Sequence, residues 1–331
     1  NAPPAALLAM AVEDHKETSD YNICVRGNVH NLGKRVPRGF LQVLSNGKPV
    51  RIAKSESGRL QLGKWLGGNT NPLTPRVYAN RIWHHLFGAG IVRTVDNFGV
   101  SGERPSHPEL LDWLAAQLMK DGWSTKSLIR HIVLSHAYRQ STRHNPAAAQ
   151  IDPENRLLWR QNRRRLDAES IRDTILAVSG QLDLTPSGPS LSPTLKSEFG
   201  FKHTSLRRSV YVPVLRNTLH EIFEVFDFSN PNLVVGRRNE STLPTQALYF
   251  MNSPFVMQQA KFAAIRLLKE PKLKRNAQIE LAYRRTIGRP PSPAEQQLTS
   301  DYLARQIQPS EKQSATEAAR IQAWSGVFQA L

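Results

Sequence analysis

Apolar residues recur at helical spacing over most of the chain after residue 71. The clearest case is NPLTPRVYANRIWHHLFGAG, residues 71–90, where Thr74 followed by Pro75 predicts the start of a helix. Successive residues turn by about 100°, so one half of this helix is apolar and the other half is polar. The polar half carries Arg76, Asn80, Arg81, His84 and His85. It is either solvated, or buried against a second domain or lining a cleft.

Three further helices are predicted between residues 106 and 182. Residues 106–122 carry a capping box from Ser106 to Glu109 and end at Gly122. Residues 123–141 are predicted to form a helix capped by Ser124. Residues 165–182 form the last of the three, which Gly180 terminates, with an apolar stripe of Ile171, Ile175, Val178 and Leu182.

The C-terminal part also has helical patterning. Residues 242–270 are predicted to form a helix in two steps, broken at Pro254. The helix over residues 292–307 begins with a capping box from Ser292 to Glu295, and residues 316–331 form a final helix.

Short β segments accompany these helices. Residues 21–29 and 207–215 have β-type composition, and residues 31–44 are predicted to be extended. The expected fold is therefore mainly α, a multi-helical globular domain with a few short β segments. We expect an extended lead-in over residues 1–70 and a helical domain over residues 71–331, with a subdivision near the loop of residues 183–205.

Charge adds a preference for anionic partners. The formal net charge of +17 attracts polyanions without choosing among nucleic acid, acidic polysaccharide and an anionic surface. The basic residues form short clusters rather than a nucleic-acid motif, so nucleic acid is the least favoured of these partners. No apolar run reaches the roughly 20 residues that span a bilayer.

Cysteine usage excludes several site types. The chain has one cysteine, Cys24, so a disulfide, a cysteine-based zinc cluster and a CxxCH haem attachment cannot form within it. Cys24 lies in YNICVRG, which is typical of a buried strand residue. His84 and His85 are adjacent rather than four residues apart, so this helix does not predict a metal site.

Weak candidates for acid–base chemistry are His84, His107, His136 and Asp96. Asp96 and His107 lie in DNFGVSGERPSHPELLDW, whose spacing does not fix how far its carboxylates lie from one another. His136 falls on the apolar side of its predicted helix. It is therefore either a core histidine bonded to a backbone carbonyl or a histidine at the floor of a pocket.

Candidate anion-binding residues are arginines. In NRRRLDAESIRD, residues 162–173, the charges have the spacing of ordinary helix ion pairs, and alternatively Arg163 or Arg164 holds an anion with a guanidinium fork. In VGRRNEST, Arg237 and Arg238 lie either in an anion-binding loop or in a structural lead-in to a helix capped by Ser241 or Thr242. Together with Arg81, these four residues form the predicted anion-binding set.

The blocks NPLTPRVYANRIWHHLFGAG, RQNRRRLDAESIRDT, RRSVYV, STLPTQALYFMNSPFV and RRTIGRPPSPAE resemble the Planctomycete-specific domain family of unknown function. The resemblance covers nearly the whole chain and supplies no catalytic residues. It implies an exported protein of planctomycete type, located in the periplasm or at the cell surface. It also implies a haem c domain and a companion domain upstream, no cofactor in this chain, and a family domain that continues beyond residue 331.

Two functions follow as leading hypotheses. In the first, the chain binds or helps to process an anionic polysaccharide together with the upstream haem domain. In the second, it is a non-catalytic structural or interaction domain that docks the haem and companion domains. The first depends on surplus positive charge being gathered in one site, and the second on the absence of a strong catalytic motif.

Overall fold

The computed structural model describes residues 11–41, 43, 50, 52–186, 188–191, 197–270, 273–307 and 317–331. Within these ranges the chain forms twelve α-helices and one two-stranded sheet, which confirms the mainly α prediction. The chain divides into two compact units, Asn1–Arg163 and Arg164–Leu331. The sequence-based boundary near residue 71 and the subdivision near residues 183–205 stay predictions.

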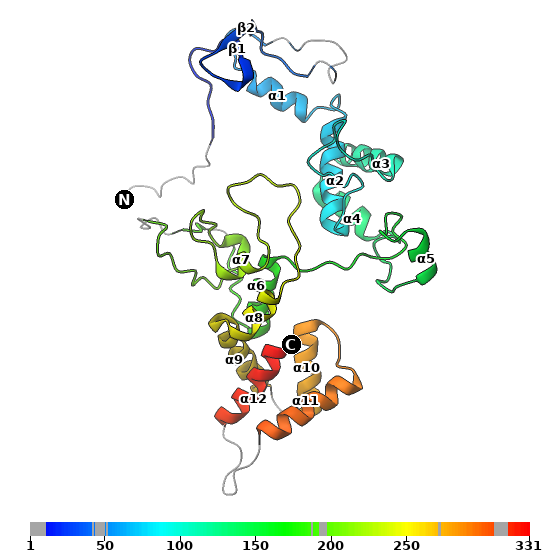
Figure 1. The fold of residues 1–331 in the computed structure, drawn as a ribbon, viewed down its shortest axis with the longest axis vertical. Coiled ribbons are helices and arrows are strands. Elements are labelled where there is room, and N and C mark those ends of the chain that lie inside the picture. Colours follow the sequence, from blue (N-terminus) through cyan, green and yellow to red (C-terminus); the bar gives the residue numbers. More distant parts are fainter. Residues whose placement is uncertain are drawn as a thin grey trace. The chain divides into compact units, whose positions relative to one another are not determined.

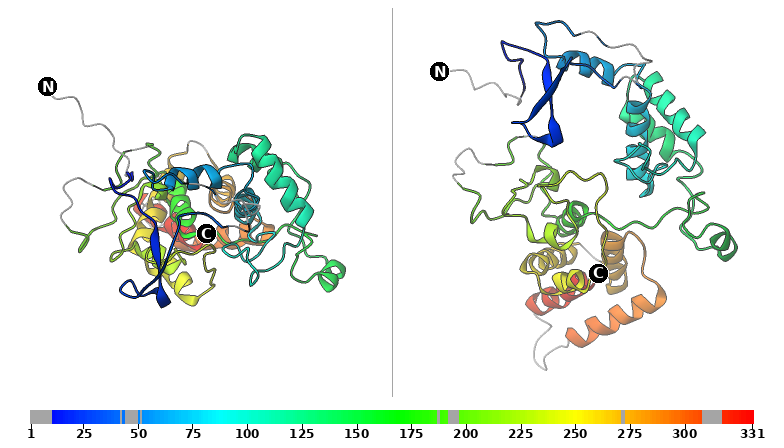
Figure 2. Two further views of the ribbon diagram at one scale, coloured as in Figure 1. Left: turned by 90° about the horizontal axis from the view of Figure 1, so that it is seen from above. Right: turned by 45° about the horizontal axis from the view of Figure 1, so that its top comes forward.

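The first unit combines a small sheet with a group of helices (Figure 1). Strands β1 (Tyr21–Cys24) and β2 (Leu32–Val36) pair antiparallel and lie side by side in both views of Figure 2, as the composition of residues 21–29 and 31–44 predicts. The helices of this unit are α1 (Arg59–Leu66), α2 (Leu73–Phe87), α3 (Pro108–Lys120), α4 (Thr125–Val133) and α5 (Pro146–Ile151).

The caps of these helices agree only partly with the sequence prediction. Ser124 caps α4, since its hydroxyl accepts a hydrogen bond from the Ser127 amide at 3.3 Å. The predicted cap at Thr74 is wrong, because the Asn71 side chain accepts the amides of Leu73 and Thr74. The predicted box at Ser106 is also wrong: its hydroxyl donates to the Ile91 carbonyl instead.

The core of the first unit lies between α2, α3 and α4, which contact one another. Trp83 and Phe87 stack with ring centroids 4.2 Å apart, and Leu114, Leu118 and Leu128 are almost fully buried beside them. Asn80 lies in this core with no exposed surface. Its amide donates to the Val92 carbonyl at 3.0 Å, and its carbonyl accepts the Val92 N–H at 2.9 Å.

Cys24 and His136 of the first unit are more exposed than the sequence predicts. Cys24 is only partly buried, because its two-stranded sheet leaves most of its side chains accessible. His136 is exposed, because α4 ends at Val133 and the following residues turn away from helical geometry. The core reading of His136 is therefore wrong, and its role at a pocket stays a prediction.

The second unit is helical, with α6 (Ala168–Ser179), α7 (Glu221–Val225), α8 (Pro244–Asn252), α9 (Pro254–Leu268), α10 (Arg275–Ile287), α11 (Pro293–Gln306) and α12 (Glu317–Ala330). Helices α9 and α12 make the most extensive contact, and α6 also packs on α9 (Figure 1). Its buried residues form two clusters. The α7–α8 cluster contains Ile222, Phe223 and Tyr249, and the α9–α12 cluster contains Leu267 and Trp324.

Several predicted helix signals of this unit are confirmed. The break at Pro254 separates α8 from α9, and Ser292 and Glu295 form the predicted capping box of α11. Gly180 ends α6 with a φ of 77°. The predicted strand over residues 207–215 is wrong, since this segment holds only a 3-10 turn and an isolated bridge between Asp183 and Arg207.

Helix α6 turns an unexpected row of residues toward the core. Its buried residues are Ala168, Arg172, Leu176 and Ser179, which repeat at helical spacing. The predicted apolar stripe of Ile171, Ile175 and Val178 is only partly buried. The stripe is therefore available to line a surface feature.

No helix within the described ranges has the length and apolar character needed to cross a membrane.

Asn80 is expected to hold α2 to the segment around Val92. Asn80→Ala leaves one buried backbone donor and one acceptor unpaired, which costs about 2–3 kcal/mol. Hydrogen exchange of the full chain, read by mass spectrometry, should show faster exchange in residues 73–87. Asn239→Ala, at an exposed position of the second unit, is the control, and equal protection of residues 73–87 in both variants would contradict this role.

Candidate binding groove and buried polar cluster

The polar half of α2 does not form one continuous face. Asn80 is buried in the core, whereas Arg81 and His85 are exposed and His84 is partly buried. Arg76 donates to Asp112 at 2.6 Å and to the Pro72 carbonyl at 2.7 Å. Asn80 therefore belongs to the core of its own unit, Arg81 and His85 are solvated, and a cleft or second domain against this half stays a prediction.

The candidate catalytic residues His84, His107, His136 and Asp96 all lie in the first unit. Asp96 lies 3.7 Å from the guanidinium of Arg81, and both are about half exposed. The ring of His107 contacts the neighbouring Ser106 hydroxyl at 3.0 Å. The catalytic role of these residues, like that of His84 and the exposed His136, stays a prediction.

Two of the predicted anion-binding arginines form ion pairs with nearby carboxylates, and the other three lie at exposed positions. Arg238 donates two hydrogen bonds to the Glu169 carboxylate, at 2.6 and 2.8 Å, and its guanidinium lies over the Phe228 ring. Arg81 pairs with Asp96. Arg163, Arg164 and Arg237 are exposed. Arg81 and Arg163 belong to the first unit and the other three to the second, so no single unit holds the whole set.

The expected helix ion pairs of residues 162–173 do not form. Arg165 precedes α6 and donates to the Ser241 carbonyl, while its guanidinium lies over the Phe226 ring. Glu169 instead accepts hydrogen bonds from Arg238. The anion-binding fork expected at Arg163 or Arg164 stays a prediction. The predicted cap at Ser241 is wrong as well, because its hydroxyl donates to the Asp227 carboxylate.

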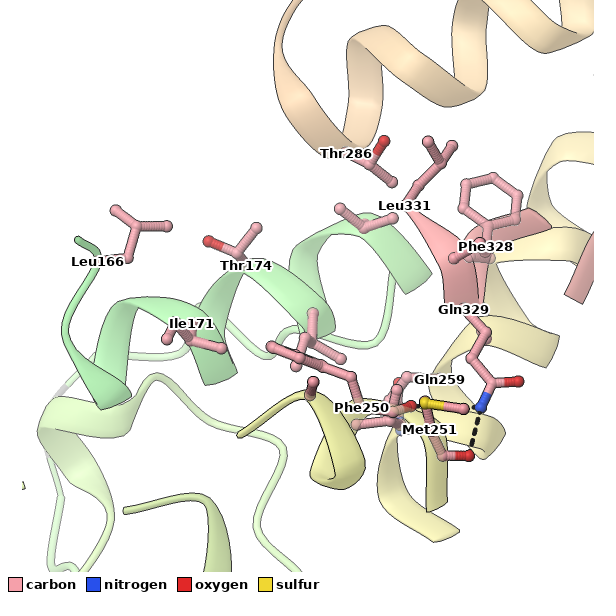
Figure 3. A pocket seen from close by; sticks show the side chains of 17 residues that line it. Leu166, Ile171, Thr174, Phe250, Met251, Gln259, Thr286, Phe328, Gln329 and Leu331 are labelled. Carbon is pink, nitrogen blue, oxygen red and sulfur yellow. Dashed lines mark hydrogen bonds between the residues drawn. The ribbon is translucent and has the colours of Figure 1, made fainter. Parts of the chain in front are cut away.

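A groove of about 490 Å³ lies beside the apolar stripe of α6 (Figure 3). We call it the α6–α12 groove. Its lining residues come from α6 and the segment before it, from α8, α9 and α10, and from the end of the chain; they are Leu166, Ile171, Thr174, Ile175, Val178, Ala247, Phe250, Met251, Val256, Gln259, Ala260, Ala263, Thr286, Phe328, Gln329, Ala330 and Leu331.

The groove lies where the two clusters of the second unit meet. Val256 belongs to the α7–α8 cluster, whereas Ala260, Ala263 and Phe328 belong to the α9–α12 cluster. The Gln329 amide fixes one wall, since it donates to the Phe250 and Met251 carbonyls, at 3.2 and 2.7 Å (Figure 3). The groove is thus bounded by well-packed elements.

Gln259 is the most buried polar residue of the groove, with 3% of its surface exposed. One end of its amide lies 2.7 Å from the Ser179 hydroxyl. The other end has no hydrogen-bond partner within the described residues. The groove therefore offers a long apolar surface with a few neutral polar groups, of which Gln259 is the most buried.

A second feature of this unit is a buried polar cluster around Arg172, which is only 1% exposed. Its guanidinium donates to the carbonyls of Ser205 and Arg207 and to the Ser209 hydroxyl. Asp173 accepts the Ser209 amide and hydroxyl, at 2.8 and 2.7 Å. These bonds attach the segment of residues 205–209 to α6.

His220, Tyr249 and Ser253 complete the buried polar cluster. Burial, and then the positive charges of Arg172 and His203, lower the pKa of His220 from 6.5 to about 4. Burial raises the pKa of Tyr249, and the charges of Glu221 and Arg172 also act on it. Arg172 therefore lies within electrostatic range of both rings.

The sequence pattern does not predict this cluster. Its members are more than 80 residues apart at the extremes. Arg172 lies in the charged segment of residues 162–173, whose spacing indicates helix ion pairs, and His220, Tyr249 and Ser253 lie in segments without a catalytic or binding motif. One signal of this cluster was available in the sequence. Arg172 lies four residues after Ala168, on a helix whose apolar stripe runs along another side. Among the described residues there is no group of three or more histidine, cysteine, aspartate or glutamate side chains that could hold a metal ion.

The low pKa of His220 makes stability depend on pH. Between pH 6.5 and pH 4 the unfolded chain binds a proton that the folded chain does not, so stability falls as the pH drops through this window. In the wild type, we expect this effect to lower the free energy of unfolding by about 3 kcal/mol at most between pH 6.5 and pH 4. In His220→Phe this pH-dependent decrease should be absent. Urea unfolding at several pH values measures it.

His30→Phe, at an exposed position of the first unit, is the control for this measurement and should keep the wild-type dependence. Identical pH dependence in wild type and His220→Phe would show that His220 does not titrate in this way.

Comparison with known proteins identifies the chain only at the level of a family. No curated protein matches it. No solved structure matches it either. A family model described as PSD1, protein of unknown function (DUF1553), matches residues 58–303, which is more than half of the chain and includes both the buried polar cluster and most of the groove. The chain therefore belongs to the PSD1 (DUF1553) family, whose function is unknown.

Proposed function

We propose that this chain is a non-catalytic interaction domain and that its α6–α12 groove binds the apolar face of a helix from a neighbouring domain. The neighbouring domains are the haem domain and the companion domain that the sequence resemblance implies. An exported location, in the periplasm or at the cell surface, is part of the same proposal. Because the chain has one cysteine, a CxxCH haem attachment lies outside these 331 residues.

The observation that carries this proposal is the chemistry of the groove. The chain has a net charge of +17, yet none of the 17 described side chains that line the groove is charged. A site for a polyanion needs cationic donors at its surface. An apolar lining with a few neutral polar groups instead favours an apolar occupant.

The shape of the lining favours a helix. Ile171, Ile175 and Val178 form a ridge spaced i, i+4 and i+7, which is about 10 Å long at the rise of an α-helix. Amphipathic helices bind grooves of this kind through apolar residues at the same spacing. Leu166 and Met251 are 57% and 63% exposed, so apolar surface is accessible at the groove before any partner binds.

Anionic polysaccharide remains the second candidate. It is favoured by Arg163 and Arg237, for which the described residues supply no carboxylate at ion-pair distance. It is weakened by Arg81 and Arg238, whose charges are matched by Asp96 and Glu169. Arg163 and Arg237 are each exposed in their own unit, and neither lines the groove.

A charge in the groove should abolish docking. Ile175→Asp places a carboxylate on the middle of the ridge, where the apolar occupant would leave it unsolvated. The neutral apolar dye N-phenyl-1-naphthylamine serves as a probe of the groove, and we expect Ile175→Asp to abolish the fluorescence enhancement that the dye shows with the wild type. We also expect the dissociation constants for the haem domain and the companion domain to rise at least tenfold.

Leu298→Asp is the matched control, because Leu298 lies on α11 of the same unit, is 66% exposed and does not line the groove. It should bind the dye and the domains like the wild type. Full association of Ile175→Asp with both domains, in a variant shown to be folded by circular dichroism, would disprove docking through the groove.

The polysaccharide alternative predicts a different result. If Arg163 and Arg237 bind sulfated polysaccharide, the double variant Arg163→Ala/Arg237→Ala should elute from a heparin column at clearly lower salt than the wild type. The docking proposal predicts only the small change expected from two lost charges, matched by Arg143→Ala/Arg208→Ala. Both control residues are exposed arginines.

A further inference from the structure

Four buried polar atoms of the cluster around Arg172 have no hydrogen-bond partner within the described residues. They are Nε of Arg172, Nδ1 of His220, the hydroxyl oxygen of Tyr249 and the hydroxyl oxygen of Ser253. The four residues are 1%, 8%, 6% and 4% exposed. Buried polar groups are nearly always hydrogen-bonded, so four orphans in one neighbourhood require an explanation.

The four residues come from three parts of the second unit that pack on one another. Arg172 lies on α6, His220 precedes α7, and Tyr249 and Ser253 lie at the end of α8. Helix α7 contacts both α6 and α8. The Tyr249 and Ser253 hydroxyls are near enough to affect each other, although they form no hydrogen bond of acceptable geometry.

All four orphan atoms can donate a hydrogen bond. Nε of arginine and the tyrosine and serine hydroxyls are donors, and Nδ1 of neutral histidine is a donor in one of its two tautomers. Arg172 supplies a positive charge at the same place. A small anion with several acceptor oxygens matches this set better than a cation or an apolar molecule.

We propose that the cluster formed by Arg172, His220, Tyr249 and Ser253 is a binding site for a small tetrahedral oxyanion such as sulfate or phosphate. The anion accepts hydrogen bonds from the four orphan donors and neutralises the buried guanidinium. This site is separate from the α6–α12 groove, because none of its four residues lines the groove. The proposal therefore does not depend on the docking function.

The carboxylates nearby leave room for an added negative charge. Asp173 is already used by Ser209 and by one terminal nitrogen of Arg172, so it does not reach the orphan Nε. Glu221 is exposed, which means that water and salt screen its repulsion. The cluster thus contains one charged group, Arg172, beside the neutral side chains of His220, Tyr249 and Ser253.

Anion binding is measured on the full chain by thermal unfolding and by isothermal titration with sodium sulfate and sodium phosphate, against sodium chloride at equal ionic strength. A ligand that binds only the folded chain raises its stability in proportion to the logarithm of ligand concentration. Sulfate also stabilises proteins by exclusion from their surface. The variants therefore provide the decisive comparison.

Tyr249→Phe and Ser253→Ala each remove one donor without changing the charge. Each should weaken sulfate or phosphate binding about tenfold or more, as expected for the loss of one hydrogen bond to a charged group. In chloride alone they should unfold no earlier than the wild type, since each hydroxyl has no partner to lose. Tyr302→Phe on α11 is the matched control and should bind like the wild type.

A sulfated disaccharide tests whether the anion is free or carried by a sugar. If sulfate or phosphate binds as tightly as the disaccharide or more tightly, the ligand is a free oxyanion. If the disaccharide binds more tightly through the same four residues, the site takes an oxyanion carried by a sugar. Equal stabilisation of wild type, Tyr249→Phe and Tyr302→Phe by every anion would overturn the proposal. So would a crystal structure grown in sulfate that shows only water between the four donors.

Discussion

The burial of the Arg172 guanidinium is the constraint on which the architecture of the second unit depends. A charged group is stable in a protein interior only when its hydrogen bonds are satisfied. The carbonyls of Ser205 and Arg207 and the hydroxyl of Ser209 meet most of this requirement. The segment of residues 205–209 is therefore held on α6, although it forms no strand.

The same constraint determines which side of α6 faces outward. Arg172 shares its row with Ala168, Leu176 and Ser179, and this row is buried. Ile171, Ile175 and Val178 lie about 100° away on the wheel. They pack at the edge of the two hydrophobic clusters, stay partly exposed and line the α6–α12 groove. Because Arg172 is buried, α6 contributes to the buried polar cluster on one side and to the apolar α6–α12 groove on another.

Local sequence signals predicted most of the helices because their information lies within a few residues. Pro254 separates α8 from α9, Gly180 ends α6, and Ser292 with Glu295 starts α11. The failures involve partners distant in sequence. Ser106 bonds Ile91 instead of Glu109, and Ser241 bonds Asp227 instead of capping a helix. Helical periodicity likewise placed His136 in a core, because it does not show where a helix stops.

The functional features were harder to predict for the same reason. Spacing identified the arginine clusters, but Glu169 is a partner of Arg238 only because the chain folds back over 69 residues. The groove requires α6, α9 and α12 to meet, and the buried polar cluster brings together residues 172, 220, 249 and 253. No local sequence pattern predicts that these helices or these four residues come together. Positive charge, the most conspicuous feature of the sequence, is partly neutralised by local carboxylates.

The central claim is that the uncharged α6–α12 groove, and not the arginine-rich surface, binds the neighbouring domains. Methyl NMR of the chain with labelled isoleucine and alanine, recorded before and after addition of the haem and companion domains, tests it most directly. The account predicts that signals of Ile171, Ile175, Ala260 and Ala263 shift together. Unchanged signals at these four residues, with the added domains bound, would contradict it.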